Sequence, residues 1–86
     1  MSDADTLIRK SVFEPKTFHA VVRAFDEGWA STRYLFAGQP QSIIEDARTA
    51  LAKGVLNAAQ SGHTAADVLK QEGIRALKVA YPHIPI

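Results

Sequence analysis

The chain has 86 residues, of which 47% are hydrophobic and 22% charged, so its composition is that of a folded domain rather than a disordered segment. Ten Lys and Arg nearly balance nine Asp and Glu, which leaves no basic surplus for nucleic acid or an anionic membrane. Cysteine is absent, which excludes disulfides, thiolate catalysis and cysteine-ligated metal sites. We expect one cytoplasmic domain, because no stretch resembles a signal peptide and no apolar run reaches the ~20 residues that span a bilayer.

Residues 1–13 are predicted to form an N-terminal arm. Its first five residues, Met1 to Asp5, are expected to fray. The apolar residues that follow suit either a short helical turn or an extended segment lying on the body: Leu7, Ile8, Val12 and Phe13. Pro15 is well placed as the first residue of a helix, since its fixed backbone angle suits that position and its missing N–H is not needed there. A change of direction is therefore expected between Phe13 and Pro15.

The first long helix is predicted over residues 15–35. Its apolar residues recur at helical spacing and form one stripe: Phe18, Val21, Val22, Phe25, Trp29 and Thr32. Gly28 lies on the flank of this stripe, where a close helix crossing would explain it. Gly38 and Pro40 mark a short loop.

The second helix, over residues 43–61, has the clearest pattern in the chain. One stripe is apolar and the opposite one polar: Ile44, Ala47, Leu51, Val55 and Ala58 against Asp46, Thr49, Lys53, Asn57 and Gln60. Ser42 and Glu45 have the spacing of a capping box, and Gly62 can adopt the left-handed conformation that ends a helix.

The third helix, over residues 65–81, has a less regular pattern. Thr64 and Asp67 could cap its start, Gly73 interrupts its middle, and the apolar tail 82–86 follows Tyr81. Its apolar residues are spread around the cylinder, which favours contacts on several sides, including with a second chain. We therefore predict a homodimer, with an interface formed by Val68, Ile74, Val79 and the outward-facing Tyr34.

Arg48 lies near the apolar stripe of the second long helix. The simplest interpretation is that its methylenes follow the core edge while the guanidinium reaches Glu45 or Asp26. The alternative is an anion-binding or ion-pair site.

No pattern in the sequence points to catalysis, a cofactor or a metal. His19, His63 and His83 lack the spacing of metal ligands, and the adjacent Asp26 and Glu27 diverge on a helix. Nucleophile elbows and phosphate-binding glycine loops are absent from the sequence. We therefore expect a non-enzymatic protein.

Residues 59–80 resemble part of a helix-turn-helix, with a glycine turn followed by a short helix and Gly-Ile. A recognition helix should then follow Ile74. Only Arg75 and Lys78 are basic in that segment, so a DNA-binding regulator is an alternative rather than the leading function.

Residues 13–80 also resemble a group of short uncharacterised proteins from alphaproteobacteria. The similarity lies in a Phe-Glu-Pro entry at 13–15, a helix ending near a tryptophan (AFDEGWAS), and a central segment with Ala47-Arg48, Leu51-Ala52-Lys53, Val55, Ala59 and Gly62. The chain departs from that group at Gly54 and Leu56, where the group is more basic, and at Thr64, where it tends to be acidic. The resemblance implies a small helical bundle and nothing catalytic.

Together these patterns predict an all-α fold, a small dimeric three-helix bundle preceded by a short N-terminal segment. The leading functional hypothesis is a protein-interaction or adaptor domain with itself and an unidentified protein as partners, without cofactor, membrane or nucleic acid. A small-ligand-binding domain, with an apolar pocket beside Trp29, is a further alternative.

Overall fold

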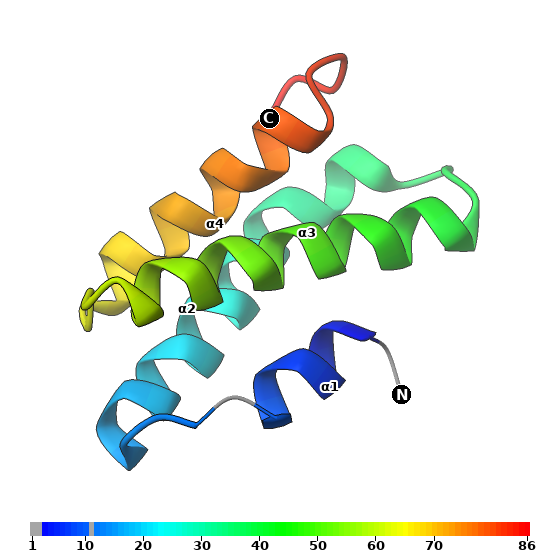
Figure 1. Ribbon diagram of the computed structural model, residues 1–86. Helices are drawn as coiled ribbons and strands as arrows, with labels where there is room; N and C mark the ends of the chain where they lie inside the picture. Colours follow the sequence, from blue (N-terminus) through cyan, green and yellow to red (C-terminus); the bar gives the residue numbers. More distant parts are fainter. Residues whose placement is uncertain (1–2, 11) are drawn as a thin grey trace.

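The computed structural model describes residues 3–10 and 12–86, and over these it is an all-α fold. Four α-helices follow one another in the chain: α1 (Asp3–Lys10), α2 (Pro15–Thr32), α3 (Gln41–Gln60) and α4 (Ala66–Ala80), with a 3₁₀ helix, η1 (Arg33–Phe36), after α2. The long helix α3 lies in the middle, with α1 on one side of it and α4 on the other (Figure 1). Helix α2 packs against both α3 and α4, so that α3 is the element on which the other helices assemble.

Most of the N-terminal arm is the helix α1, so of the two predicted conformations, a helical turn or an extended segment, the helical one is observed. The expected fraying of residues 1–5 is wrong for residues 3–5, which belong to α1, while residues 1 and 2 lie outside the described residues. The physical reason is burial, since the side chain of Ala4 is fully buried and that of Ile8 nearly so. Phe13 is half-buried against the same cluster, whereas Val12 is almost entirely exposed.

Helix α2 begins at Pro15 as predicted, and it ends three residues earlier than expected. Glu14 is extended, and its carbonyl accepts a hydrogen bond from the backbone N–H of Phe18 (2.8 Å). The chain then tightens into η1, which turns Phe36 into a fully buried position. Gly38 follows with a φ of 87°, a backbone conformation that favours glycine and ends this segment.

The two predicted capping boxes are wrong. Pro40 rather than Ser42 precedes α3, and its carbonyl accepts the N–H of Ile44 (3.1 Å), so Ser42 lies inside the first turn. Glu45 instead accepts a hydrogen bond from the side chain of Gln41 (3.0 Å). At α4 the N-cap is Ala65, which makes no side-chain cap. In both places the helix boundary differs by one or two residues from the one that the cap residues suggested.

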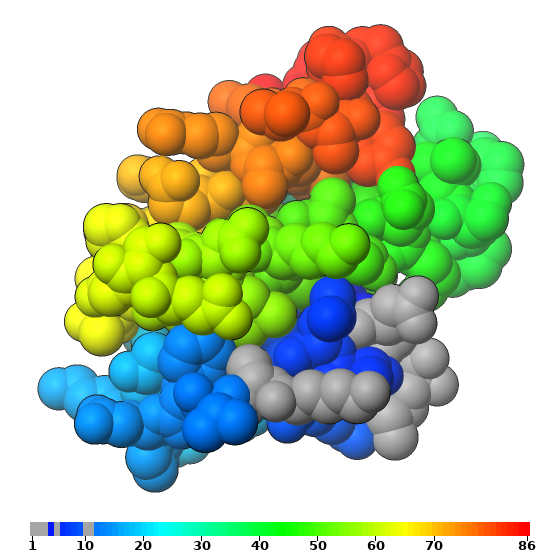
Figure 2. Space-filling model, viewed as in Figure 1, coloured from blue at the N-terminus to red at the C-terminus, as the bar shows by residue number. Residues whose placement is uncertain are grey.

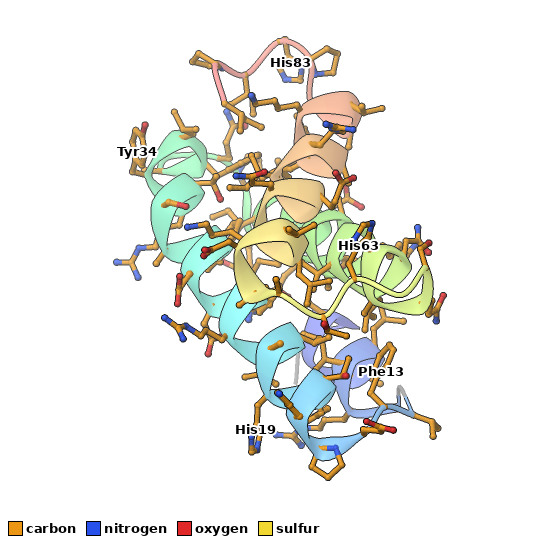
Figure 3. All side chains as sticks on the ribbon, turned by 90° about the vertical axis from the view of Figure 1, so that its left-hand side faces the viewer. Phe13, His19, Tyr34, His63 and His83 are labelled. Atoms are coloured by element: carbon orange, nitrogen blue, oxygen red, sulfur yellow. The ribbon has the colours of Figure 1, made fainter. Side chains whose placement is uncertain are left out.

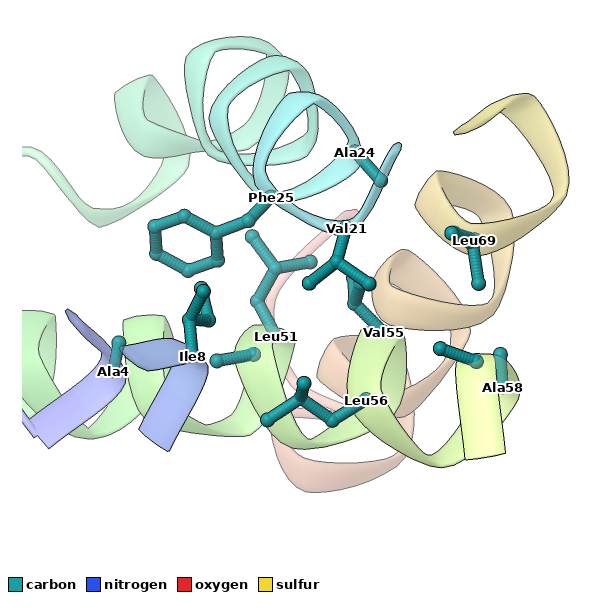
Figure 4. Packing of buried hydrophobic residues seen from close by; sticks show 12 residues of the cluster. Ala4, Ile8, Val21, Ala24, Phe25, Leu51, Val55, Leu56, Ala58 and Leu69 are labelled. Atoms are coloured by element: carbon teal, nitrogen blue, oxygen red, sulfur yellow. The ribbon is translucent and has the colours of Figure 1, made fainter. Parts of the chain in front are cut away.

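The largest hydrophobic cluster joins all four helices around α3 (Figure 4). Its buried members come from α1, α2, α3 and the start of α4: Ala4, Ile8, Val21, Ala24, Phe25, Leu51, Ala52, Val55, Leu56, Ala58, Ala59 and Leu69. Leu51 and Val55 belong to the predicted stripe, which is therefore confirmed as core. Burying side chains of this size contributes roughly 1.5–3 kcal/mol each, which is why these positions decide how the helices pack.

A second, smaller cluster lies where the start of α3 meets the end of α4. Phe36, Ala47, Leu77 and Tyr81 are buried there, and Ile84 and Ile86 of the tail pack against them. The ring of Phe36 contacts that of Tyr81 edge to face, with centroids 5.3 Å apart. Trp29 lies between the two clusters and packs against both.

Candidate functional site

Helices α3 and α4 approach each other closely where they cross, at two facing glycines. A Cβ atom on Gly54 would lie 2.6 Å from Cβ of Ala76 and 2.9 Å from Cα of Gly73, and one on Gly73 would lie 2.6 Å from Cγ2 of Val55. These distances are too short for real side chains, so only glycine allows the two backbones to approach this closely. Gly73 interrupts the apolar stripe but not the helix, since α4 runs unbroken from Ala66 to Ala80.

The turn between α3 and α4 is set by Gly62, as predicted. Its φ is 103°, its N–H donates to the carbonyl of Ala59 (3.1 Å), and the N–H of His63 donates to that of Ala58 (3.1 Å). This pair of bonds is the Schellman motif, which ends a helix and reverses the chain within a few residues. It brings α4 back alongside α3.

Small side chains at the crossing leave a groove of about 410 Å³ between the two helices. Figure 2 shows this face, with the yellow-green atoms of α3 beside the orange atoms of α4. The residues that line it are small at the centre and larger or polar around it: Gly54, Ala58 and Ala76, then Asn57, Ser61, His63, Glu72, Arg75 and Val79. The groove therefore combines an apolar floor with a polar edge, an arrangement suited to binding rather than to any particular reaction.

Some of the polar side chains that line the groove make contacts within the chain. The hydroxyl of Ser61 donates to the carbonyl of Asn57 (2.9 Å), one helical turn earlier. Arg75 Nη1 lies 3.7 Å from Glu72 Oε1. The side chain of Arg75 is nevertheless 75% exposed, so its remaining donors face solvent. Arg75 therefore stays accessible at the edge of the groove despite its contact with Glu72.

A second hollow, of about 200 Å³, lies between α1 and α2. It is mainly apolar, with Arg9 and Asp26 among its lining residues: Ile8, Arg9, Phe18, Val22, Phe25 and Asp26. Trp29 lines neither of these two hollows and packs instead against both hydrophobic clusters.

The four predicted interface residues have different environments. Val79 is 77% exposed, Tyr34 is 69% exposed and projects outward from η1, and Val68 is 36% exposed (Figure 3). Ile74 is half-buried and packs against the large cluster, which leaves it less free surface for an interface than the other three. The structure thus leaves Val68 and Val79 on the outside of α4 and takes Ile74 into the fold.

Arg48 lies at the edge of the core. Its guanidinium carbon is 5.5 Å from the ring centroid of Phe25, and its Nη1 is 3.8 Å from Glu45 Oε1. A cation above an aromatic ring and beside a carboxylate is a stabilising arrangement within the monomer. Asp26, the other partner considered for Arg48, lines the smaller hollow.

The one strongly perturbed titratable group in the described part of the chain is Tyr81, at the end of α4. Burial and the hydrogen bond that its hydroxyl donates to Asp46 raise the pKa of Tyr81 from 10.0 to about 12. Asp46 belongs to the exposed side of α3, so this bond ties the start of α3 to the end of α4. Its role is structural, since it lies away from the groove.

Among the described residues, no three His, Asp or Glu side chains lie close enough together to hold a metal ion. The three histidines lie apart: His19 on α2, His63 in the turn and His83 in the tail (Figure 3). Likewise, none of the helices described is long and apolar enough to cross a membrane.

Sequence reasoning missed the glycine crossing and the groove that it creates. A signal was present, since Gly54 and Ala58 are four residues apart and thus share one face of α3. Small residues at that spacing let helices approach closely. What the sequence could not supply was the matching glycine on α4, because pairing depends on how the two helices are placed.

Comparison with known proteins adds no name to this site: no family model matches the chain, and no curated protein or solved structure matches it significantly. The class of protein that the described residues define is an all-α helical domain with a groove between α3 and α4. The resemblance to short alphaproteobacterial proteins stays a prediction.

Proposed function

We propose that the protein is a small non-enzymatic interaction domain that acts as a homodimer and binds its partner protein through the assembled surface. The observation that carries this proposal is the outer side of α4, where Val68 and Val79 lie exposed and Val79 lines the α3–α4 groove. Apolar side chains next to an open groove with a polar edge are typical of surfaces that bind another protein.

Two features of the fold support binding over catalysis. The hydroxyl of Ser61 donates to a backbone carbonyl one helical turn earlier, and Arg75 pairs with Glu72, so neither contact is that of a nucleophile with a base. The most perturbed pKa belongs to Tyr81, which is buried where the start of α3 meets the end of α4. The surface therefore offers shape and charge rather than an activated group.

The first experiment is the solution mass of the purified chain, measured by light scattering after size exclusion over a wide dilution series. For a chain of 9.4 kDa, we expect a mass that approaches twice this value as concentration rises. A monomer at every concentration would contradict the homodimer, and affinity capture with the monomer would then identify what binds the exposed side of α4.

Small-ligand binding is the second candidate, favoured by the volume of the groove. About 410 Å³ lies within the range of small-molecule sites. A fragment screen by NMR, with chemical shifts of Ala58 and Ala76 followed, tests this candidate. Shifts confined to these residues would favour it, and the absence of any saturable shift would exclude the fragments tested.

DNA binding has less support. Because α4 continues as one helix to Ala80, no separate recognition helix follows Ile74. Arg75, one of the two basic residues in this segment, is already paired with Glu72. Binding of the purified chain to duplex DNA that weakens as salt is added would support this alternative.

A further inference from the structure

The outer side of α4 carries four residues that form a line along the helix, which we call the α4 ridge: Val68, Glu72, Arg75 and Val79. At about 100° per residue they fall within an arc of about 60°. The buried residues Leu69, Gly73 and Leu77 lie on the other side of the helix. Arg75 and Val79 of the ridge are well exposed, Val68 is 36% exposed and Glu72 is half-buried, so the ridge runs along the edge of the groove.

The order of residues along the ridge is self-complementary. From either end it runs valine, charged residue, charged residue, valine, with spacings of four, three and four. A two-fold axis through the midpoint between Gly73 and Ile74 brings position 68 opposite 79 and position 72 opposite 75. Both apolar pairs and both opposite-charge pairs form at once, as an isologous interface requires, where residue i contacts j and j contacts i.

We propose that a second copy of this chain packs antiparallel along the α4 ridge, with Val68 against Val79 and Glu72 against Arg75 of the other copy. This inference rests on the proposed homodimer and specifies its surface and register. Charge complementarity selects the second copy as the occupant, because the ridge is its own complement when reversed.

The exposure of the ridge residues fits this arrangement. The side chain of Arg75 is 75% exposed and its contact with Glu72 is long, at 3.7 Å, so the guanidinium can reach a second carboxylate. Val79 has most of its surface left to bury, and it borders the groove, which gives room for side chains from the other copy.

The ends of α4 add a further favourable term to an antiparallel pair. Asp67 lies in the first turn and Lys78 in the last. In an antiparallel pair the first turn of one helix meets the last turn of the other. Asp67 of one copy then approaches Lys78 of the other, and the two helix dipoles point in opposite directions, which is favourable. A parallel pair would bring like charges together instead.

Charge exchange tests the register. In the Glu72→Arg variant the introduced arginine of each copy faces Arg75 of the other, and in the Arg75→Glu variant the introduced glutamate faces Glu72. We expect the dissociation constant of either homodimer to rise about tenfold or more, because two attractive pairs become repulsive. Mixed in equal amounts, the two variants should associate with each other, since every pair between the two chains then joins opposite charges.

Arg23→Glu serves as the matched control. It makes the same charge change as Arg75→Glu and breaks an exposed ion pair of α2, in which Arg23 Nε lies 2.6 Å from Glu27 Oε2. We expect its dissociation constant to equal that of the unaltered chain. Sedimentation equilibrium over a dilution series measures the dissociation constants of the unaltered chain, the three variants and the mixture. Circular dichroism checks that each variant remains helical.

Disulfide trapping provides a second measurement that does not depend on charge. The chain has no cysteine of its own. In an antiparallel pair, position 68 of one copy meets position 79 of the other, whereas equal positions lie roughly 16 Å apart, beyond disulfide reach. An oxidised mixture of Val68→Cys and Val79→Cys should therefore give a covalent heterodimer, and either variant alone should remain monomeric on a non-reducing gel.

The outcomes separate the inference from the proposed function. A stable dimer that neither charge variant weakens, with no 68–79 disulfide, would overturn the ridge and leave the homodimer standing on another surface. A chain that stays monomeric at all concentrations would overturn both. Weakened single variants, a restored mixture and the mixed disulfide together would establish the ridge.

Discussion

Helices α3 and α4 each carry a second set of apolar residues beside the stripe that packs in the core, and the two sets have different fates. On α3 the second set includes Ala52 and Leu56, and α1 packs there, with Ala4 and Ile8 in the same cluster. On α4 the corresponding residues, Val68 and Val79, remain exposed. The second apolar set of α3 is thus covered by α1, whereas that of α4 is not covered by any described helix. We therefore assign the second apolar set of α4 to contact with a second molecule.

The largest expected effect is in the shared core. Leu51→Ala removes a fully buried side chain that contacts α2 and approaches Gly73 of α4. We expect the free energy of unfolding to fall by about 2–5 kcal/mol, because a large-to-small change loses burial and leaves a cavity. Urea denaturation followed by circular dichroism measures this change in the free energy of unfolding. A loss below about 0.5 kcal/mol would mean that α3 presents a different face to the core.

The glycine crossing gives the next effect, with a matched control. Gly54→Ala should destabilise the fold by about 1–3 kcal/mol, since the new Cβ would lie 2.6 Å from Ala76 and 2.9 Å from the backbone of Gly73. Gly28→Ala meets its nearest neighbour, Leu51, at 3.4 Å, an ordinary contact. We expect Gly28→Ala to be neutral or to stabilise α2 by up to about 1 kcal/mol. Thermal unfolding of both variants measures the two changes in stability. Equal losses of stability would contradict a special close approach at Gly54.

The two sides of α4 are compared by placing the same charge on each. Ile74→Glu buries part of a carboxylate against the large cluster and should destabilise the monomer by about 1–3 kcal/mol. Val79→Glu should leave monomer stability within about 0.5 kcal/mol, because the valine is 77% exposed. Unfolding measured at high dilution, where the chain is monomeric, separates this effect from association. A larger loss for Val79→Glu than for Ile74→Glu would reverse the assignment of the two sides.

The smallest effect concerns the end of α4 and depends on pH. Tyr81→Phe removes the hydrogen bond to Asp46 and should cost about 1 kcal/mol at neutral pH. The native chain holds the phenol proton to higher pH than the unfolded chain, since the pKa is raised from 10.0 to about 12. The stabilisation by the hydroxyl is therefore complete below pH 10 and is lost as the pH rises toward about 12.

Unfolding free energies of the unaltered chain and of Tyr81→Phe, measured from neutral pH to about pH 12, check this linkage. The difference between the two proteins should be constant up to pH 10 and then shrink. A difference that grows with pH would mean that the tyrosinate, rather than the phenol, is the form that the fold stabilises.

Local patterns determined much of this protein. The stripe of α3, the entry of α2 at Pro15 and the turn at Gly62 could all be predicted, because helical periodicity, the fixed φ of proline and the positive φ of glycine act within a few residues. The all-α fold class follows from these patterns. The exposed positions of Val68, Val79 and Tyr34 were also read correctly, since each lies off an apolar stripe.

Only the tertiary structure decided how the faces meet. Gly73 interrupts the apolar stripe of α4, and only the fold places it against Gly54; Ile74 lies off that stripe, and only the fold packs it against the large cluster. The helicity of the N-terminal arm likewise depends on burial of Ala4 and Ile8 against the cluster that α3 shares. Residue spacing determines which side of a helix is apolar, but the element that covers it is chosen by packing between segments far apart in the chain, and this packing also left Val68 and Val79 of α4 exposed.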